Sequence, residues 1–381
     1  MNNKQSYNLA MYRKSHEIMN GSFFDRIGIA DMEKVHSAVI GWIFSDECKA
    51  LTNQQKSELL CSLFHVMPSQ TFNSFVVEVE HHDIDVLIIT DNNTCWVIEN
   101  KIKSSQHSNQ LDRYYNIIKG EPVKIGRKIQ SIQDYMQLKS HYCFLTLVGE
   151  NPKCTNNVWE NTTYKSFSTA LKSVLSNDNR NSDYIILNEY LCCITNLADA
   201  LDEFINDHLR YKYVFDDGTN KKKRNGNYIA DNGLETIFQK CFLSHIIGKT
   251  KNYSGFDISE THGIALAEKK DVLFIRDYKL GIQFQNGSFK AQILNESIGA
   301  TDFWNHWNGR ITKTNNGVKI NNMHFSGWTF NTSKSQKGSY FSISKKIPNW
   351  YSKSVADIVS DWDTMYNACM DVLNEISKII P

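Results

Sequence analysis

The sequence lacks the features of a secreted disulfide scaffold, a zinc-binding module or a membrane protein. Its nine cysteines are scattered and no two are spaced as Cys-x-x-Cys, so they predict reduced core thiols. No apolar run approaches the roughly 18 residues that a membrane-spanning helix needs. The polar N-terminus also lacks the apolar core of a signal peptide. We therefore expect a soluble, cytoplasmic protein with no membrane partner.

The chain also lacks an excess of charge of either sign. Its 42 Lys and Arg residues stand against 41 Asp and Glu residues, which gives a formal net charge of +1. No global basic field therefore indicates a nucleic-acid partner, and such a partner would have to be bound by local patches. An ordinary neutral cytosolic protein fits the net charge equally well. The length of 381 residues and the 41% hydrophobic content predict a globular chain of two domains.

The N-terminal part, residues 1–215, has the pattern of an α/β domain. Its elements follow in the order helix, strand, strand, strand, helix, strand, which predicts a mixed central sheet flanked by helices. Two further helices are expected after these elements. The expected helices cover residues 31–44, 54–70, 104–118, 130–139, 164–176 and 184–209, and the expected strands cover 75–80, 84–89, 95–102 and 142–148.

The C-terminal part, residues 228–381, differs in character. Residues 216–227 break all periodicity and include four consecutive cations, so they are the candidate basic linker or loop. Beyond them, alternating runs and the Asn286-Gly287 dipeptide predict strands joined by a hairpin. An amphipathic pattern over 355–380 predicts a final helix. We expect a β-rich domain closed by a helix, and its sequence indicates no chemistry.

Two neighbouring strands carry the candidate site. Their apolar runs, 84–89 and 95–102, are separated by a turn signal at 91–93. Because side chains alternate along a strand, Glu99 and Lys101 share one face and Asn100 takes the other. If the two strands pair with their faces aligned, Asp85 joins Glu99 and Lys101. Two carboxylates and an ammonium group at one point indicate a divalent-metal site for phosphodiester chemistry.

The Glu-x-Lys tripeptide alone is weak evidence, because it occurs three times, at Glu47, Glu99 and Glu268. Context separates the three. Only Glu99 ends an apolar strand, follows a strand that offers an acid and precedes a helix that bears glutamine. Glu47 lies at a polar helix end. Glu268 has Asp257 upstream and is the internal alternative, but no glutamine-bearing helix follows it.

This arrangement resembles the PD-(D/E)XK nuclease superfamily, and most closely the bacterial stand-alone nucleases whose second motif reads Ile-Glu-Asn-Lys. The matching pieces are Ile98-Glu99-Asn100-Lys101, Ile84-Asp85-Val86, Glu33-x-x-His36-Ser37, Gln110-Leu111-x-x-Tyr114 and residues 159–164. The resemblance is specific over 33–114 and looser to about 210. The proline of the family's name is absent, and His82 or Ile84 stands in its place.

The resemblance implies a restriction-endonuclease-like core and a bound Mg²⁺ or Mn²⁺ ion. The metal ligands that it implies are the carboxylates of Asp85 and Glu99, which are hard oxygen donors suited to these ions. The carbonyl group of Asn100 is a further ligand. Glu33 reaches the ion from the first helix, directly or through a metal-bound water. Asp83 has the same strand parity as Asp85 and is the alternative first ligand.

Other residues receive supporting roles from the same resemblance. Lys101 would orient or help to activate the attacking water, and Gln110 would position the nucleophile or a phosphate, supported by Tyr114. The imidazole of His36 is expected to pack, not to act as a base. Three nearby residues are expected to stay out of the site: Glu78 and Glu80 face solvent, and His82 points away from His81, which prevents joint chelation.

The implied reaction is hydrolysis of a phosphodiester to a 5′-phosphate and a 3′-hydroxyl. DNA is favoured over RNA as the nucleic-acid partner, in the setting of bacterial anti-phage defence. Two alternatives stay open: a ribonuclease on the same fold, including one that cleaves tRNA, and an inert nucleic-acid-binding or regulatory module. A homo-oligomer or a partner subunit is compatible with either. C-terminal aromatics would stack on bases or fill a core: Phe303, Trp304, Trp307, Trp328, Trp350 and Tyr351.

Overall fold

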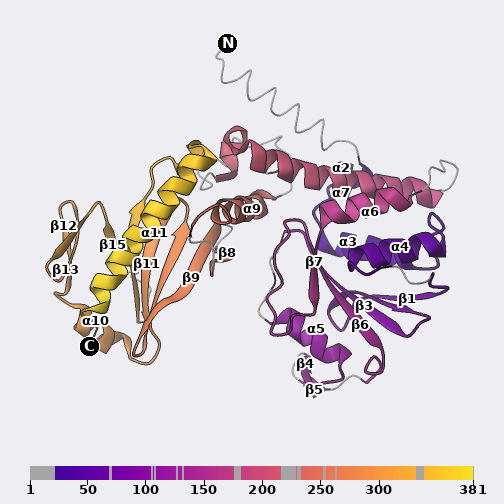
Figure 1. The fold of residues 1–381 in the computed structure, drawn as a ribbon, viewed down its shortest axis with the longest axis horizontal. Coiled ribbons are helices and arrows are strands. Elements are labelled where there is room, and N and C mark those ends of the chain that lie inside the picture. The colour runs from indigo at the N-terminus through magenta and orange to yellow at the C-terminus, as the bar shows by residue number, and fades with distance from the viewer. Residues whose placement is uncertain are drawn as a thin grey trace, which may run out of the picture. The chain divides into compact units, whose positions relative to one another are not determined.

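The computed structural model describes residues 22–67, 71–103, 106, 109–125, 128–130, 133–175, 182–215, 229, 233–251, 255–261, 264–331 and 339–380. They fall into two compact units (Figure 1). The first contains the described residues up to Glu203 together with 229 and 233–237. The second contains 204–215 and the described residues from Phe238 onward. The expected linker, 216–227, lies outside the described residues.

The first unit is built on a five-stranded mixed sheet with the strand order β1-β2-β3-β6-β7. Its first three strands form an antiparallel meander, and β6 and β7 add in parallel. The predicted α/β core with a mixed sheet is therefore confirmed. Its strands are β1 (Phe75–His81), β2 (Ile84–Thr90), β3 (Thr94–Lys101), β6 (Lys139–Thr146) and β7 (Trp159–Thr163), with a separate pair β4 (Val123–Ile125) and β5 (Lys128–Gln130).

Helices cover both faces of this sheet (Figure 1). The helices of this unit are α2 (Phe23–Arg26), α3 (Glu33–Phe44), α4 (Asn53–Leu63), α5 (Gln110–Ile118), α6 (Tyr164–Val174) and α7 (Ser182–Asn206). Figure 1 shows α3 and α4 on one side of the strands and α5 on the other. Because both faces are covered, every residue of β3 is buried, and its sequence is apolar until the polar residues at its end.

The helix expected over 130–139 is wrong. Residues 134–137 form a turn, and β6 begins directly after it at Lys139. The side chain of Tyr135 is buried and its hydroxyl donates to Glu78, 3.1 Å away. The main-chain N–H of Lys139 donates to the carbonyl of Asn93 at 3.1 Å, which starts the parallel pairing with β3. These tertiary contacts outweigh the local helical pattern.

The second unit contains a six-stranded antiparallel sheet with the order β15-β16-β11-β10-β9-β8. The final helix, α11 (Val355–Ser377), packs on β10 and β11, so the β-rich unit with a closing helix is as predicted. Its other elements are η1 (His208–Phe215), α9 (Glu235–Ile247, which begins in the first unit), β8 (Asp257–Thr261), β9 (Ile264–Ile275), β10 (Tyr278–Gln285), β11 (Ser288–Asn295), α10 (Ala300–Trp307), β12 (Ile311–Thr314), β13 (Gly317–Ile320), β14 (Met323–Ser326), β15 (Thr329–Asn331), β16 (Tyr340–Lys346) and η3 (Trp350–Ser352).

The predicted hairpin joins β10 and β11. Asn286 and Gly287 have φ of 47° and 74°, the left-handed pair that a two-residue hairpin turn requires. A Cβ atom at Gly287 would lie 2.3 Å from Cδ1 of Trp350, so the ring packs where only glycine fits. Four of the aromatic side chains considered for base stacking are core residues instead: Phe303, Trp307, Trp328 and Trp350 are all at most 5% exposed.

Two further expectations concern the cysteines and membrane-spanning helices. All nine cysteines are free thiols, and seven of them are buried, as the scattered pattern predicted. Within the described parts of the chain, no helix has the length and apolar content to cross a membrane.

Candidate active site

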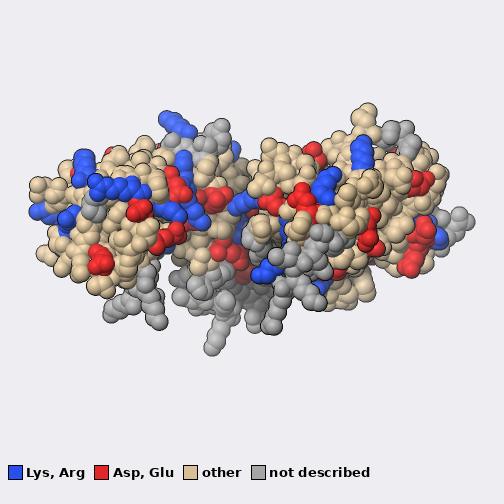
Figure 2. Space-filling view, turned by 90° about the horizontal axis from the view of Figure 1, so that it is seen from below, with Lys and Arg blue, Asp and Glu red and all other residues tan. Residues whose placement is uncertain are grey.

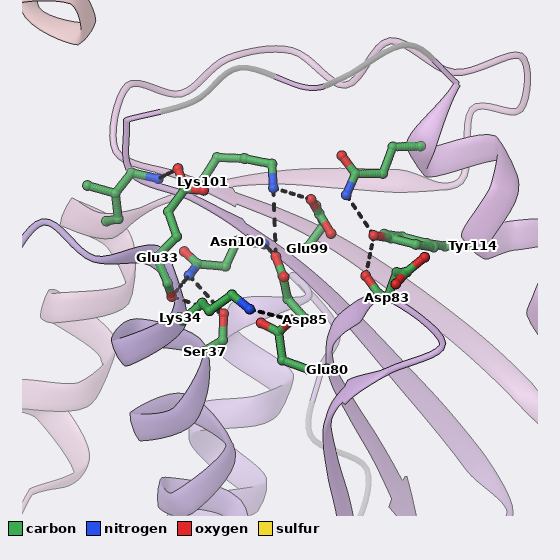
Figure 3. A network of polar contacts seen from close by, with 12 residues as sticks. Glu33, Lys34, Ser37, Glu80, Asp83, Asp85, Glu99, Asn100, Lys101 and Tyr114 are labelled. Atoms are coloured by element: carbon green, nitrogen blue, oxygen red, sulfur yellow. Dashed lines mark hydrogen bonds and ion pairs between the residues drawn. The ribbon is translucent and has the colours of Figure 1, made fainter. Parts of the chain in front are cut away.

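The candidate site lies where the ends of β2 and β3 meet the first turn of α3 (Figure 3). The strand register pairs Val86 with Ile98, and one further step places Asp85 opposite Glu99 on the same face. Nζ of Lys101 lies 2.5 Å from Oε1 of Glu99 and 4.0 Å from Oδ2 of Asp85. The structure therefore brings together the three side chains that strand alternation placed on one face.

Glu99 is the buried centre of this group. Its side chain is 0% exposed, and its Oε2 atom has no hydrogen-bond partner among the described residues. Burial, and then the charge of Asp85, raise the pKa of Glu99 well above its ordinary value. Burial also raises the pKa of Asp85, against the opposing effect of Lys101. Burial lowers the pKa of Lys101, but the two carboxylates outweigh it and the net shift is upward.

The donor set fits a hard divalent cation. A buried carboxylate oxygen without a partner, beside a second carboxylate, is where a cation would offset both charges. The main-chain N–H of Asn100 donates to Oδ2 of Asp85 at 2.7 Å. Since the N–H and C=O groups of one strand residue point to the same side, the carbonyl oxygen of Asn100 also faces Asp85. Two carboxylates and a carbonyl, completed by water, suit Mg²⁺ or Mn²⁺.

Glu33 lies at the start of α3, and the structure shows what its carboxylate contacts. Its Oε1 atom accepts hydrogen bonds from the main-chain N–H groups of Ile102 and Lys103, at 3.0 Å each. No group of three or more His, Cys, Asp or Glu side chains is placed to hold a metal ion in the described ranges. The structure therefore does not bring the carboxylate of Glu33 into one cluster with Asp85 and Glu99.

The side chain of Asn100 faces away from the metal side and is fully hydrogen-bonded. Its Nδ2 atom donates to the carbonyl of Glu33 at 3.0 Å and to Oγ of Ser37 at 3.1 Å. Its Oδ1 atom accepts from the hydroxyl of Tyr164, 2.5 Å away in the first turn of α6. The side-chain amide of Asn100 thus supplies both the N–H donors and the oxygen acceptor that these three contacts need. Tyr164 belongs to the segment singled out by resemblance, but its contact with Asn100 could not be foreseen.

His36 is a buried structural residue. Its Nε2 atom lies 2.8 Å from the carbonyl of Ala30, which can only accept, so Nε2 carries the proton. Its Nδ1 atom, 3.1 Å from the hydroxyl of Tyr190, is then the acceptor. Burial lowers the pKa of His36 to about 4, so the ring is neutral near pH 7. These contacts agree with a packing role and leave no proton to exchange with a substrate.

Gln110 and Tyr114 lie one turn apart at the start of α5. Nε2 of Gln110 donates to the hydroxyl of Tyr114 at 2.6 Å, and that hydroxyl donates to the main-chain carbonyl of Asp83. Burial raises the pKa of Tyr114, which keeps the hydroxyl protonated. Oε1 of Gln110 is buried and has no hydrogen-bond partner among the described residues. The pair therefore attaches α5 to the turn that precedes β2.

Asp83 is not on a strand face. It lies in the two-residue β1–β2 turn with φ of 66°, its side chain is 65% exposed, and its Oδ2 atom lies 3.4 Å from Nη2 of Arg113. Asp85 is therefore the acid that faces Glu99. The expectation that His81 and His82 point to opposite faces is wrong, because His82 also lies in the turn, with φ of 53°. Their ring centroids are 4.0 Å apart.

Glu80 faces solvent, as expected, with its side chain 42% exposed, but its backbone was not predicted. It has φ of 57° where the pairing of β1 with β2 skips a residue, between Val79↔Val86 and His81↔Ile84. Its carboxylate lies 3.8 Å from Nζ of Lys34, and its charge contributes to the raised pKa of Asp85. Glu80 thus borders the site (Figure 3). Nothing in the sequence predicts that the backbone of a glutamate within a strand adopts a left-handed conformation.

The rival tripeptides lie in more exposed surroundings than Glu99, since the side chain of Glu268 is 19% exposed and that of Lys270 is 70% exposed. Glu47 is exposed in the turn after α3. Glu268 lies within β9, where it pairs across the sheet with Asp257 and lies 3.5 Å from Nζ of Lys270. Another strand, β10, follows β9.

Comparison with known proteins gives one match. The family model described as the PD-(D/E)XK nuclease superfamily matches residues 22–206. This range contains Glu33, Asp85, Glu99, Lys101 and Gln110 and ends before most of the second unit. No curated protein matches the chain, and no solved structure does.

Proposed function

We propose that this chain, whose residues 22–206 belong to the PD-(D/E)XK nuclease superfamily, is a Mg²⁺- or Mn²⁺-dependent nuclease that hydrolyses DNA. Family membership supports a nuclease that acts on nucleic acid. The observation that carries the proposal is the buried group of Asp85, Glu99 and Lys101, in which Glu99 is 0% exposed and keeps an unpartnered oxygen. The preference for DNA and the anti-phage setting rest on the resemblance to bacterial stand-alone nucleases.

Asp85, Glu99 and the carbonyl oxygen of Asn100 would hold the ion. When bound, the ion supplies Lewis-acid stabilisation of charge on the phosphate and makes a neighbouring water more acidic. By holding the ion, the two carboxylates would also determine where the phosphodiester is bound. Gln110, whose Oε1 atom is buried without a partner, would orient the water or a phosphate.

Lys101 would act as a cationic donor. Its ammonium group lies 2.5 Å from Oε1 of Glu99, and the two carboxylates raise its pKa, which favours the charged form. It offsets the negative charge that develops on the phosphate. Water adds its oxygen to phosphorus, the bond to the 3′-oxygen breaks and that oxygen takes a proton. The products are a 5′-phosphate and a 3′-hydroxyl.

The experiment is a panel of duplex DNA, single-stranded DNA, bulk RNA and tRNA, incubated with the full chain and Mg²⁺, Mn²⁺ or a chelator. We expect cleavage of DNA that requires metal and leaves 5′-phosphate ends. Cleavage of RNA alone would replace DNA with RNA as the substrate. Failure to cleave any substrate, together with no Mn²⁺ binding by calorimetry, would contradict a metal-dependent nuclease and favour an inert module.

A further inference from the structure

The residues on both sides of Lys101 are hydrogen-bonded to the first turn of α3. On one side, Asn100 donates from its side chain to Glu33 and Ser37. On the other, the N–H groups of Ile102 and Lys103 both donate to Oε1 of Glu33. Lys101 is the only residue between these two attachments. Its backbone is therefore held from this helix turn, in addition to the N–H of Leu147, which donates to the carbonyl of Lys101 at 3.0 Å.

Glu33 makes this attachment with its carboxylate charge. Two consecutive N–H groups aimed at one oxygen form a small anion-binding nest, and hydrogen bonds to an ionised acceptor are stronger than neutral ones. A second tie supports the first, because Nζ of Lys103 forms an ion pair with Asp31, just before α3. The turn after β3 is thus held to residues 31–33 by both main chain and side chain.

The same contacts argue against coordination by Glu33. Figure 3 shows Glu33 directed at the main chain beside Lys101, whereas the carboxyl groups of Asp85 and Glu99 face the ammonium group. For Oε1 to reach an ion at Asp85 and Glu99, it would have to leave two N–H groups without an acceptor. Buried N–H groups rarely go unpaired, because the cost is that of a lost hydrogen bond.

We propose that Glu33 is a positioning residue for Lys101, acting through the N–H groups of Ile102 and Lys103, and is not a ligand of the metal. The proposal deepens the proposed function and rests on it. Its consequence for catalysis is geometric, since a displacement of about 1 Å at a reacting group costs up to 100-fold in rate. A positioning role needs only an acceptor at Oε1, whereas a carboxylate ligand also contributes a negative charge to the ion, which an amide does not.

Glu33→Gln separates the two roles, because its amide oxygen still accepts from both N–H groups but carries no charge. We expect Glu33→Ala to lower kcat by about 10- to 100-fold and Glu33→Gln to recover most of that loss. The dissociation constant for Mn²⁺, measured by calorimetry on the full chain, should change less than about threefold in both variants. Asp85→Asn is the ligand control and should weaken Mn²⁺ binding at least about tenfold.

Hydrogen exchange at the amides of Ile102 and Lys103 reports on the attachment without any catalysis. Glu33→Ala should speed their exchange, and Glu33→Gln should restore most of the protection. The proposal is overturned if Glu33→Gln weakens Mn²⁺ binding as much as Asp85→Asn, or if Glu33→Ala leaves exchange unchanged. If the wild-type chain neither cleaves nor binds Mn²⁺, the proposed function fails, and the exchange rates alone still decide whether Glu33 holds this segment.

Discussion

Burying a carboxyl group that keeps an unpartnered oxygen costs free energy of folding, and Glu99 is such a group. The carboxylate of Asp85 lies beside it and adds to that cost. Residues with such perturbed pKa values concentrate at functional sites, although structural ion pairs perturb pKa values too. What distinguishes Glu99 is the combination of burial, an adjacent acid and an adjacent ammonium group within the residues that match a nuclease family model. This combination is the residue-level basis of the proposed metal site.

The pH dependence of stability should carry the signature of His36. The unfolded chain binds a proton there below the ordinary pKa of 6.5, but the folded chain does so only below about 4. Stability is therefore full above pH 6.5 and falls as the pH drops towards 4, by about 2 kcal/mol at pH 5 from this residue. We expect urea unfolding of His36→Gln to show a smaller loss of free energy between pH 7.5 and pH 5. An equal loss in both proteins would contradict this account of His36.

Alternation along a strand predicted the face shared by Asp85, Glu99 and Lys101, because that period is local to the backbone. Local signals could not predict the partners of Glu33, which lie 69 and 70 residues along the chain. Nor could they place Glu80 or His82, since their left-handed backbones depend on how β1 and β2 pair. What the sequence missed at the site is therefore mostly long-range hydrogen bonding and turn geometry.

At the scale of elements, α3 determines the geometry of the site, because its first turn carries Glu33 and its body packs on β1, β2 and β3. The packing is close at Gly41, where an added Cβ atom would lie 2.4 Å from Cγ2 of Val79. The glycine at this point of α3 is thus explained by the close approach of β1.

Gly41→Ala should destabilise the chain by about 1–3 kcal/mol through overpacking, although alanine favours a helix by about 1 kcal/mol. Val79→Ala in the same chain should restore much of the loss, which makes the pair non-additive. The free energies of unfolding in urea measure both effects. The Val79→Ala background is the control, because it removes the atom that an added Cβ at Gly41 would meet. An equal cost of Gly41→Ala in the wild-type and Val79→Ala chains would rule out the close approach.

Periodicity predicted most elements correctly, including the long helix α7 and the closing helix α11, because long amphipathic runs bury one stripe wherever they pack. It failed at 130–139, where the apolar spacing fits a helix but Tyr135 packs from a turn. The second unit also contains most of α9 and all of α10, two helices that the sequence pattern of residues 228–381, dominated by strands, did not predict. Short segments carry too few repeats to outweigh tertiary contacts.

At the scale of the molecule, the distribution of charge does not indicate where nucleic acid would bind. On the face drawn in Figure 2, basic and acidic side chains of the described residues are interspersed, in keeping with the net charge of +1. A nucleic-acid substrate would therefore have to be bound by local patches. The family match ends at residue 206, so it gives no role to most of the second unit.

Metal should stabilise the whole chain if the site is formed as described. Ligand that binds only the folded state adds about 2.7 kcal/mol at a hundredfold excess over its dissociation constant. We expect Mn²⁺ to raise the unfolding temperature of the wild-type chain and of Glu268→Gln, and to leave that of Glu99→Gln nearly unchanged. A shift of equal size in Glu99→Gln would place the bound metal elsewhere.

The most direct test of the central claim compares cleavage by two matched variants. Glu99→Gln and Glu268→Gln each remove one charge from a Glu-x-Lys tripeptide, but only Glu99 lies in the buried group with Asp85 and Lys101. Initial rates on the substrate that the wild-type chain cleaves, with Mg²⁺ or Mn²⁺ present, should fall at least about 100-fold in Glu99→Gln. They should stay near the wild-type rate in Glu268→Gln. Cleavage by Glu99→Gln at the wild-type rate would contradict the assignment of the active site.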